Sequence, residues 1–401
     1  MKDFWKNKRV LWTVYALAAV IVSAQALHLG ERAGGYTFYE NYVIFKNAFP
    51  HLLHGLNPYA DFPAEQWDLY KYSPAFALFM APFAALPDWA GLPLWNLLNA
   101  LVLLAAILRL PLLSEGQRGF VAWFVLLELI TSMQNSQSNG LTAGLMLWTF
   151  IAFERGKMWQ AAGFVAGSAF IKIFGFASAV LVLLYAKWRA FLVFSESNGS
   201  AFWKFVGWLM AWVLSLALIP LLFMSPSHLW QVYEWWWELL RDDHAASVGL
   251  SVQGWLQTWF GWMPSKMGVT LAGMAILTAS IVAVSRVPSA ANRVLACASL
   301  MLWVVVFNHK AESPTFIIAM CGIALWWCVA EKRAWERALL WVAFALVSLS
   351  PTDIFPPNIR REIIQPFVLK AVPCIAIWGI ITWKLLRRAR THFIRGQKLK
   401  T

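Results

Sequence analysis

Long apolar runs separated by short polar turns dominate the chain, and their lengths predict its elements. A helix needs about 20 apolar residues to cross the hydrocarbon core of a membrane, and shorter helices fit where protein covers their ends. The pattern predicts about twelve spans, at 10–29, 90–109, 119–134, 139–154, 159–171, 173–187, 203–224, 267–285, 293–308, 313–330, 335–350 and 366–385. The first run is too long and lacks a clear cleavage site for a signal peptide, so we interpret it as a span. The sequence therefore predicts an all-α, polytopic integral membrane bundle with 1–401 as a single transmembrane domain.

Two long connections, 30–89 and 225–266, interrupt this pattern. Within the first, residues 40–54 have the spacing of an amphipathic helix that lies along the membrane surface. It is followed by "DLYKYSP" and then by "AFALFMAPFAALP", a run too short for an ordinary span, which we interpret as re-entrant or interfacial. The second connection contains "WQVYEWWWELLRDDH", which predicts an interfacial helix.

Composition and charge agree with a membrane protein and give it an orientation. Apolar residues form 60% of the chain, charged residues only 13%, and the mean hydropathy is +0.58, whereas a soluble domain has about 25% charged residues. Both termini are basic, as are the turns at 109–118, 155–157, 187–189, 286–293 and 332–337, and in the twelve-span topology all of them fall on one face. The positive-inside rule makes that face cytoplasmic. We therefore expect a multi-pass protein of the bacterial cytoplasmic (inner) membrane with both termini in the cytoplasm, and no nucleic-acid partner for the net charge of +13.

Several polar residues lie where the hydropathy pattern does not require them. Lys172 separates two short spans, and Glu128 lies inside another, with a partner that the sequence does not identify. A charged residue in an apolar setting is by default a functional-site hypothesis, although Lys172 could also snorkel to the interface. The turn "MQNSQSNGL" adds four amides that either line a site or satisfy helix ends: Gln134, Asn135, Gln137 and Asn139.

The polar residues of the outer loops suit one kind of chemistry. A carboxylate at the membrane surface can act as general base on a hydroxyl, and a nearby cation can stabilise a phosphate leaving group. A transferase that moves a sugar from a lipid-linked phosphate donor onto a hydroxyl needs both. The first loop offers acids, among them Glu40 and Asp68, together with Lys71 and Tyr72. The turn "NHKAES" contributes His309, Lys310 and Glu312. Any single loop acid could equally be an ordinary solvated residue.

An ordered set of motifs resembles glycosyltransferase family 87. The set comprises "GLNPY", "YKYSPAFALFMAPFAALP", the helix "WNLLN", the amide turn "QNSQSNGL" and the intramembrane lysine motif "AFIKIFGF". The resemblance covers most of the chain and is strongest over 50–190. It implies a GT-C-like multispan enzyme whose first loop is extracytoplasmic and catalytic. It also implies a polyprenyl-phosphate sugar donor, often polyprenyl-phosphate mannose, transfer with inversion, and a lipid or glycan hydroxyl as acceptor.

The resemblance also suggests roles for individual residues. The family's presumed base is an aspartate roughly eighteen residues before the tyrosine of "NPY", a position that Asn41 occupies here. Glu40, next to it, and Asp68 are the alternative bases. We expect four basic residues to bind the donor phosphate: Lys172, His309, Lys310 and Lys71. We expect seven polar residues to bind the substrates: Tyr72, Gln134, Asn135, Gln137, Asn139, Glu312 and Gln253. His309 could instead hydrogen-bond Glu312 in a structural role.

Two other classes of function remain open. A lipid or glycolipid transporter or flippase would use the intramembrane charges Lys172 and Glu128. If the protein were an inactive glycosyltransferase-like assembly subunit, the presence of Asn41 where the family has its presumed catalytic aspartate would be explained. The outer loops contain no Asp-x-Asp pair, and Asp242–Asp243 on the second loop is a weak metal signal, so we expect no metal or other cofactor. The expected partners are membrane lipids, a polyprenyl-phosphate-linked sugar and a glycan or glycolipid acceptor.

Overall fold

The computed structural model describes residues 4–32, 34–185, 200–242, 248–287 and 289–398. The end of the predicted span 173–187, the basic turn 187–189 and Asp243 lie outside these described residues. Within the described ranges every named element is a helix, and the one β-type pairing is an isolated bridge between Glu31 and Thr37. The prediction of an all-α fold is confirmed for this part of the chain.

The helices follow the hydropathy pattern closely in the first half of the chain and are more irregular in the second. Their bounds are η1 Phe4–Lys6, α1 Lys8–Leu29, α2 Glu40–Leu53, α3 Pro74–Phe79, α4 Ala81–Ala84, α5 Asp88–Arg109, α6 Glu115–Gln134, α7 Asn139–Glu154, α8 Met158–Ile171, η2 Ile173–Leu184, α10 Ser200–Leu218, η3 Ile219–Leu222, α11 Pro226–Asp242, α12 Val252–Phe260, α13 Lys266–Ser285, α14 Ala290–Val306, η4 Ser313–Thr315, α15 Phe316–Cys328, α16 Ala334–Phe344, η5 Ala345–Leu349, α17 Pro357–Ile359, η6 Arg360–Ile364 and α18 Val372–Lys398. All twelve predicted spans thus contain helix.

Among the described residues, four helices are long and apolar enough to cross a membrane, judged by length and composition: Lys8–Leu29, Asp88–Leu108, Ala201–Leu222 and Lys266–Ser285. The third has only 11% of its most apolar window buried inside the protein, and the fourth 28%. Such exposed apolar helix faces are typical of contact with lipid. Other apolar helices are shorter than a full span, so the count of twelve spans stays a prediction.

Four local details differ from the sequence predictions. The segment Ile173–Leu184 forms a 3₁₀-helix instead of an α-helix, and Ala345–Leu349 is a π-helical turn. The last long helix begins at Val372, six residues later than the predicted span 366–385. Serine followed by proline at 313–314 is typical of a helix N-cap with proline at the first helical position. Here the 3₁₀-turn begins at Ser313 itself, after Glu312, and the Ser313 hydroxyl accepts from Lys370 instead of capping the turn.

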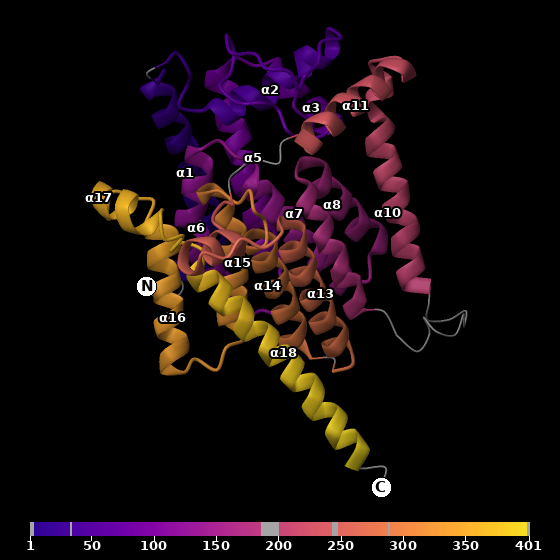
Figure 1. Ribbon diagram of the computed structural model, residues 1–401, viewed down its shortest axis with the longest axis vertical. Helices are drawn as coiled ribbons and strands as arrows, with labels where there is room; N and C mark the ends of the chain where they lie inside the picture. Colours follow the sequence, from indigo (N-terminus) through magenta and orange to yellow (C-terminus); the bar gives the residue numbers. More distant parts are fainter. Residues whose placement is uncertain (1–3, 33, 186–199, 243–247, 288, 399–401) are drawn as a thin grey trace.

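The apolar side chains form two cores. The larger core joins α1, α5–α8 and α13–α15 with α18, whereas the smaller one lies beneath the first loop and is rich in aromatic rings. In the smaller core Phe45 of α2 packs edge-on against Trp95 of α5 and against Phe76 of α3. Helices α2, α3 and α11 consequently gather at one end of the bundle, at the top of Figure 1, and the C-terminal end of α18 lies at the opposite end. The candidate site lies at the end that carries the first loop.

Candidate functional site

Lys172 lies at a break between two helices. It ends α8 and precedes η2 with an extended backbone (φ −139°, ψ 121°). The chain turns tightly there: a Cβ on Gly175 would lie 2.5 Å from the carbonyl carbon of Ser168, so only glycine fits without a shift. The break thus leaves Lys172 between two helices, with its side chain bonded to residues of a neighbouring turn.

The Lys172 ammonium is held by neutral oxygens. It donates to the side-chain oxygens of Asn139 (2.7 Å) and Gln137 (3.3 Å), and lies 5.8 Å and 5.9 Å from the ring centres of Tyr72 and Phe174. Among the described residues no carboxylate lies within hydrogen-bond distance of it. Its positive charge therefore remains available to an anionic ligand, since amide oxygens and rings solvate a cation without neutralising it.

The amide turn that receives Lys172 is fixed by side chains from two other helices. The Trp95 indole of α5 donates to the carbonyl oxygen of Ser136 (2.9 Å), and Asn99, also on α5, accepts from the backbone N–H of Leu141 (2.8 Å). These contacts explain the "WNLLN" motif as a support for the turn. Asn41 of α2 donates to the carbonyl oxygen of Asn135 (2.9 Å). An aspartate could not make that bond, so asparagine at this position ties the first loop to the turn.

The first loop reaches the same place through Tyr72 and Ser73. The Ser73 hydroxyl donates to the carbonyl oxygen of Phe170 (2.5 Å), two residues before Lys172. Burial raises the pKa of Tyr72 above its usual value, and the neighbouring carboxylate of Glu312 raises it further. The Tyr72 phenol therefore stays protonated and can donate a hydrogen bond at any physiological pH.

Glu312 brings a carboxylate to this cluster. It is exposed and interacts electrostatically with Lys172 and Tyr72, and its carboxylate forms no hydrogen bond or salt bridge with any residue that the structure describes. Its turn is braced from outside, because the backbone N–H of Leu250 donates to the carbonyl oxygen of Ala311 (2.9 Å). Gly249, at φ +57°, lies so close that a Cβ there would be 2.5 Å from the His309 carbonyl oxygen. A rigid turn thus presents a carboxylate across from a cation.

The two acids that we selected in the first loop have local partners instead. Glu40 accepts from the backbone N–H of Trp67 and from both the N–H and the hydroxyl of Thr37, each at 3.1 Å, and its side chain is buried. Asp68 binds Lys71 at 3.0 Å and accepts from the N–H of Leu69. In this arrangement Glu40 organises the loop and Lys71 neutralises Asp68.

The remaining candidates are distributed around the site. His309 and Lys310 are half-buried in the turn that carries Glu312, and the Lys310 N–H donates to the side chain of Asn308. Gln134 is exposed at the end of α6. Gln253 is buried and donates to the carbonyl oxygen of Pro264 (2.9 Å), which is a contact within its own loop.

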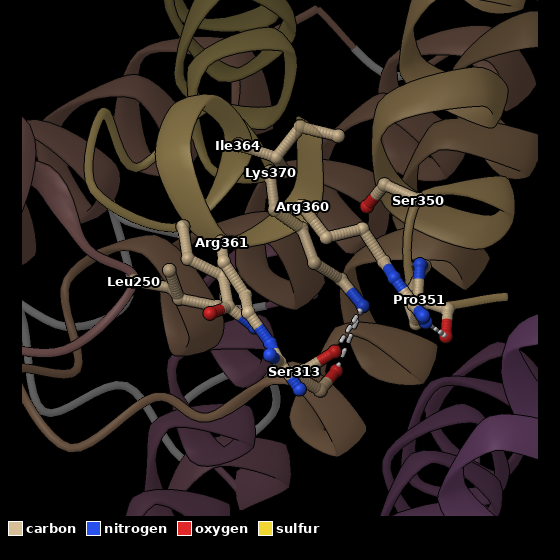
Figure 2. Close-up of a pocket in the computed structure, with 9 residues that line it drawn as sticks. Leu250, Ser313, Ser350, Pro351, Arg360, Arg361, Ile364 and Lys370 are labelled. Carbon is tan, nitrogen blue, oxygen red and sulfur yellow. Dashed lines mark hydrogen bonds between the residues drawn. The ribbon is translucent and has the colours of Figure 1, made fainter. Parts of the chain in front are cut away.

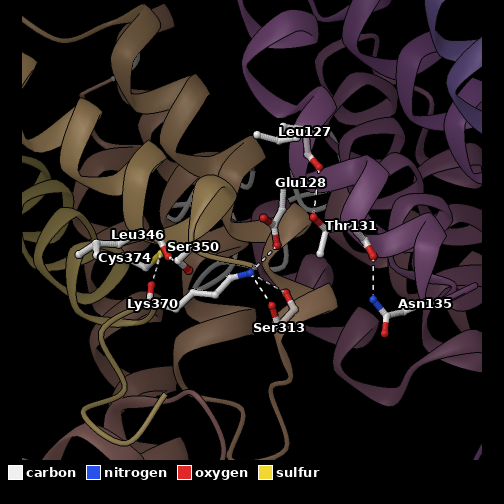
Figure 3. Close-up of polar contacts among 9 residues, drawn as sticks. All are labelled: Leu127, Glu128, Thr131, Asn135, Ser313, Leu346, Ser350, Lys370 and Cys374. Carbon is white, nitrogen blue, oxygen red and sulfur yellow. Dashed lines mark hydrogen bonds and ion pairs between the residues drawn. The ribbon is translucent and has the colours of Figure 1, made fainter. Parts of the chain in front are cut away.

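A buried ion pair next to this site was not identified from the sequence. Lys370 donates to Glu128 (2.8 Å) and to the hydroxyl and carbonyl oxygens of Ser313 (2.7 and 3.1 Å), as Figure 3 shows. The side chain of Lys370 is 3% exposed and that of Glu128 0%. Lys370 falls inside the predicted span 366–385, so the rule that selected Lys172 would have selected it too. It supplies the partner of Glu128 that the sequence left unnamed.

The cluster combines a cation without a paired carboxylate, a carboxylate without a bound cation, and a protonated phenol. Such a set can bind an anionic group and accept a proton from a hydroxyl close to it. No group of three or more His, Cys, Asp or Glu side chains that could hold a metal ion occurs among the residues that the structure describes.

An apolar helical bundle with these groups at one end is the arrangement expected of a membrane-embedded transferase. The sequence pattern of glycosyltransferase family 87 matches residues 70–351, most of the chain, and the chain therefore belongs to that family. The family resemblance drawn from the motifs is thus confirmed, and the protein is a membrane glycosyltransferase. No curated protein gave a significant match. Among solved structures, the chain is similar to a crystal structure of ArnT from Cupriavidus metallidurans bound to undecaprenyl phosphate, with a TM-score of 0.41 and 12% identity, over 95% of this chain and 77% of that chain.

Proposed function

We propose that the protein transfers a sugar, with mannose as the first candidate, from a polyprenyl-phosphate donor to a hydroxyl of a lipid or glycan on the extracytoplasmic face of the bacterial cytoplasmic membrane. The observation that carries the proposal is that Lys172 and Glu312 interact electrostatically across the site without forming an ion pair. A cation solvated by the Gln137 and Asn139 amides faces a carboxylate that has no partner of its own among the described residues. Membership of the family supplies the reaction class, and the apolar helices around the site suit a lipid-linked donor.

The proposed roles follow from the charges. Glu312 accepts the proton of the acceptor hydroxyl as that oxygen forms a bond to the anomeric carbon. The bond between the anomeric carbon and the phosphate oxygen breaks, its electron pair stays on the phosphate, and Lys172 stabilises the charge that develops there. Attack opposite the leaving phosphate inverts the anomeric carbon. Tyr72, which stays protonated, donates a hydrogen bond to the donor phosphate or sugar.

Glu312 takes the place of the bases that the sequence suggested. Glu40 already accepts three hydrogen bonds that fix the loop, and Asp68 is neutralised by Lys71. Asn41 cannot act as a carboxylate base, and its amide supports the turn beside Lys172. These contacts favour Glu312 as the base and leave Glu40 and Asn41 as positioning residues.

A transfer assay in proteoliposomes tests the proposal. The purified protein receives a panel of polyprenyl-phosphate sugars with a crude lipid acceptor extract, and release of polyprenyl phosphate is measured. Glu312→Gln should lower kcat by about 100-fold or more, the usual loss for a general base, with little change in KM for the donor. Lys172→Gln should raise the donor KM as well as lower kcat, because it contacts the phosphate in both states. Glu331→Gln is the matched control, since this acid forms only an exposed pair with Arg333.

Three results would contradict the proposal. Full activity of Glu312→Gln with loss in Asp68→Asn would move the base to the first loop. If Lys172→Gln released polyprenyl phosphate with unchanged kcat and donor KM, Lys172 would not contact the donor phosphate. No release from any donor by well-folded protein would favour an inactive assembly subunit or a transporter, which a lipid-scrambling assay in the same vesicles distinguishes.

A further inference from the structure

A cavity of about 370 Å³ lies beside the turn that carries Glu312, and none of the residues that contact Lys172 lines it. It is lined by Leu250, Ser313, Ser350, Pro351, Arg360, Arg361, Ile364, Gln365 and Lys370. Three of these residues are cations and none is an acid. In Figure 2 the side chains of Arg361 and Lys370 both point toward Ser313.

The three cations differ in how far they are neutralised. Lys370 is buried and paired with Glu128. Arg360 donates to the carbonyl oxygen of Pro351 (3.0 Å), and its carboxylate partner Asp353, at 3.3 Å, is fully exposed and therefore weak. The Arg361 side chain has no hydrogen bond or ion pair with any residue that the structure describes. The cavity therefore carries uncompensated positive charge.

The shape and the surroundings indicate what would bind. A guanidinium suits the planar, two-pronged recognition of a phosphate oxygen pair, and the Ser313 and Gln365 side chains add polar groups. The same segment exposes three large apolar side chains, Ile354, Ile363 and Phe367. A free anion would not use them, whereas a lipid would place its chain on them and its phosphate in the cavity.

We propose that this cavity binds the phosphate group of a membrane lipid, at a site separate from Lys172. Because Ser313 follows Glu312 directly, a lipid held there would present its headgroup next to the proposed base. The inference does not rest on the proposed function, since binding is measured without transfer. A phosphomonoester lipid and a phosphodiester lipid share the chemistry that the cavity recognises, and the experiment separates them.

Native mass spectrometry of the full-length protein in neutral detergent is the test. The probes are farnesyl phosphate, lysophosphatidylglycerol, neutral farnesol and inorganic phosphate, and all variants carry Lys172→Gln to remove the other phosphate contact. Arg361→Gln should weaken binding of the phosphate lipid about tenfold, which corresponds to about 1.4 kcal/mol for one charge-assisted contact. Arg360→Gln should weaken it similarly. Arg337→Gln removes an exposed arginine of α16 and should leave binding unchanged.

The outcomes separate cleanly. If the arginine variants lose mainly the binding of farnesyl phosphate, the cavity is a phosphomonoester site. If they lose mainly the binding of lysophosphatidylglycerol, it is a phosphodiester site. Equal affinity of the Arg361→Gln and Arg337→Gln proteins for every probe overturns the proposal, as does binding of farnesol at the same strength as farnesyl phosphate. Inorganic phosphate that binds as tightly as the lipids would overturn the lipid assignment. Arg361→Gln breaks no side-chain hydrogen bond or ion pair within the described residues, so loss of fold does not mask the answer.

Discussion

The buried pair of Lys370 and Glu128 gives a sharp prediction about stability. The two residues are 242 positions apart, and the pair joins the segment before α18 to the C-terminal half of α6. Both side chains are almost fully buried, at 3% and 0% exposure, and Lys370 also donates to Ser313. Replacing only one partner therefore leaves a charge without compensation inside the bundle.

The expected magnitude follows from that burial. Removing one partner of a buried pair costs about 3–5 kcal/mol, whereas replacing both by apolar groups of similar size is often close to neutral. Lys370→Met and Glu128→Leu should each destabilise by about that amount. With an unfolding entropy of roughly 2.1 cal/mol/K per residue, the melting temperature of a chain this long should fall by about 4–6 °C. The double variant should recover most of the loss, except for about 1 kcal/mol from the Ser313 oxygens left without a donor.

Thermal unfolding of the purified proteins in one detergent, monitored by tryptophan fluorescence, provides the comparison. The coupling energy of the double-mutant cycle is the decisive quantity, because it isolates the pair from other effects of each substitution. A coupling below about 0.5 kcal/mol, the limit expected for independent sites, would refute the reasoning. So would single variants that unfold within 1 °C of the wild type.

Two further predictions concern the helix break and the first loop. Gly175→Ala places a Cβ 2.5 Å from the backbone of Ser168 and should destabilise by about 1–3 kcal/mol in the same melting assay, whereas Gly167→Ala, with no atom within 4 Å, should be neutral or stabilising. Burial, and then the carboxylate of Asp88, raise the pKa of Tyr39 from 10.0 to about 12. Between these pH values the unfolded phenol loses its proton and the folded one keeps it, so stability should fall as pH rises; Tyr39→Phe should flatten that slope, and an unchanged slope would contradict the assigned pKa.

Much of the candidate site could be selected from local sequence because its residues stand out from their surroundings. Lys172 is a charge between apolar runs, and the amides Gln137 and Asn139 interrupt two helices. The structure brings these three together. Glu312 was selected from its polar turn, but as a substrate contact. The sequence could not tell that Glu40 is engaged by Thr37 and Trp67 while Glu312 is free of partners within the described residues, because hydrogen-bond saturation depends on how a loop folds over itself.

The sequence by itself determined the class of protein, the helix positions and the family, because hydropathy, helix length and ordered motifs are local properties of the chain. The tertiary structure alone decided which polar groups meet. The Glu128–Lys370 pair, the support of the amide turn by Trp95, and the cavity beside Ser313 all join segments far apart in sequence. The hydropathy pattern of a helix predicts which of its faces is buried, but it does not predict which other helix that face contacts. In an apolar bundle, that choice of neighbour decides whether a buried charge is neutralised or remains available to a ligand.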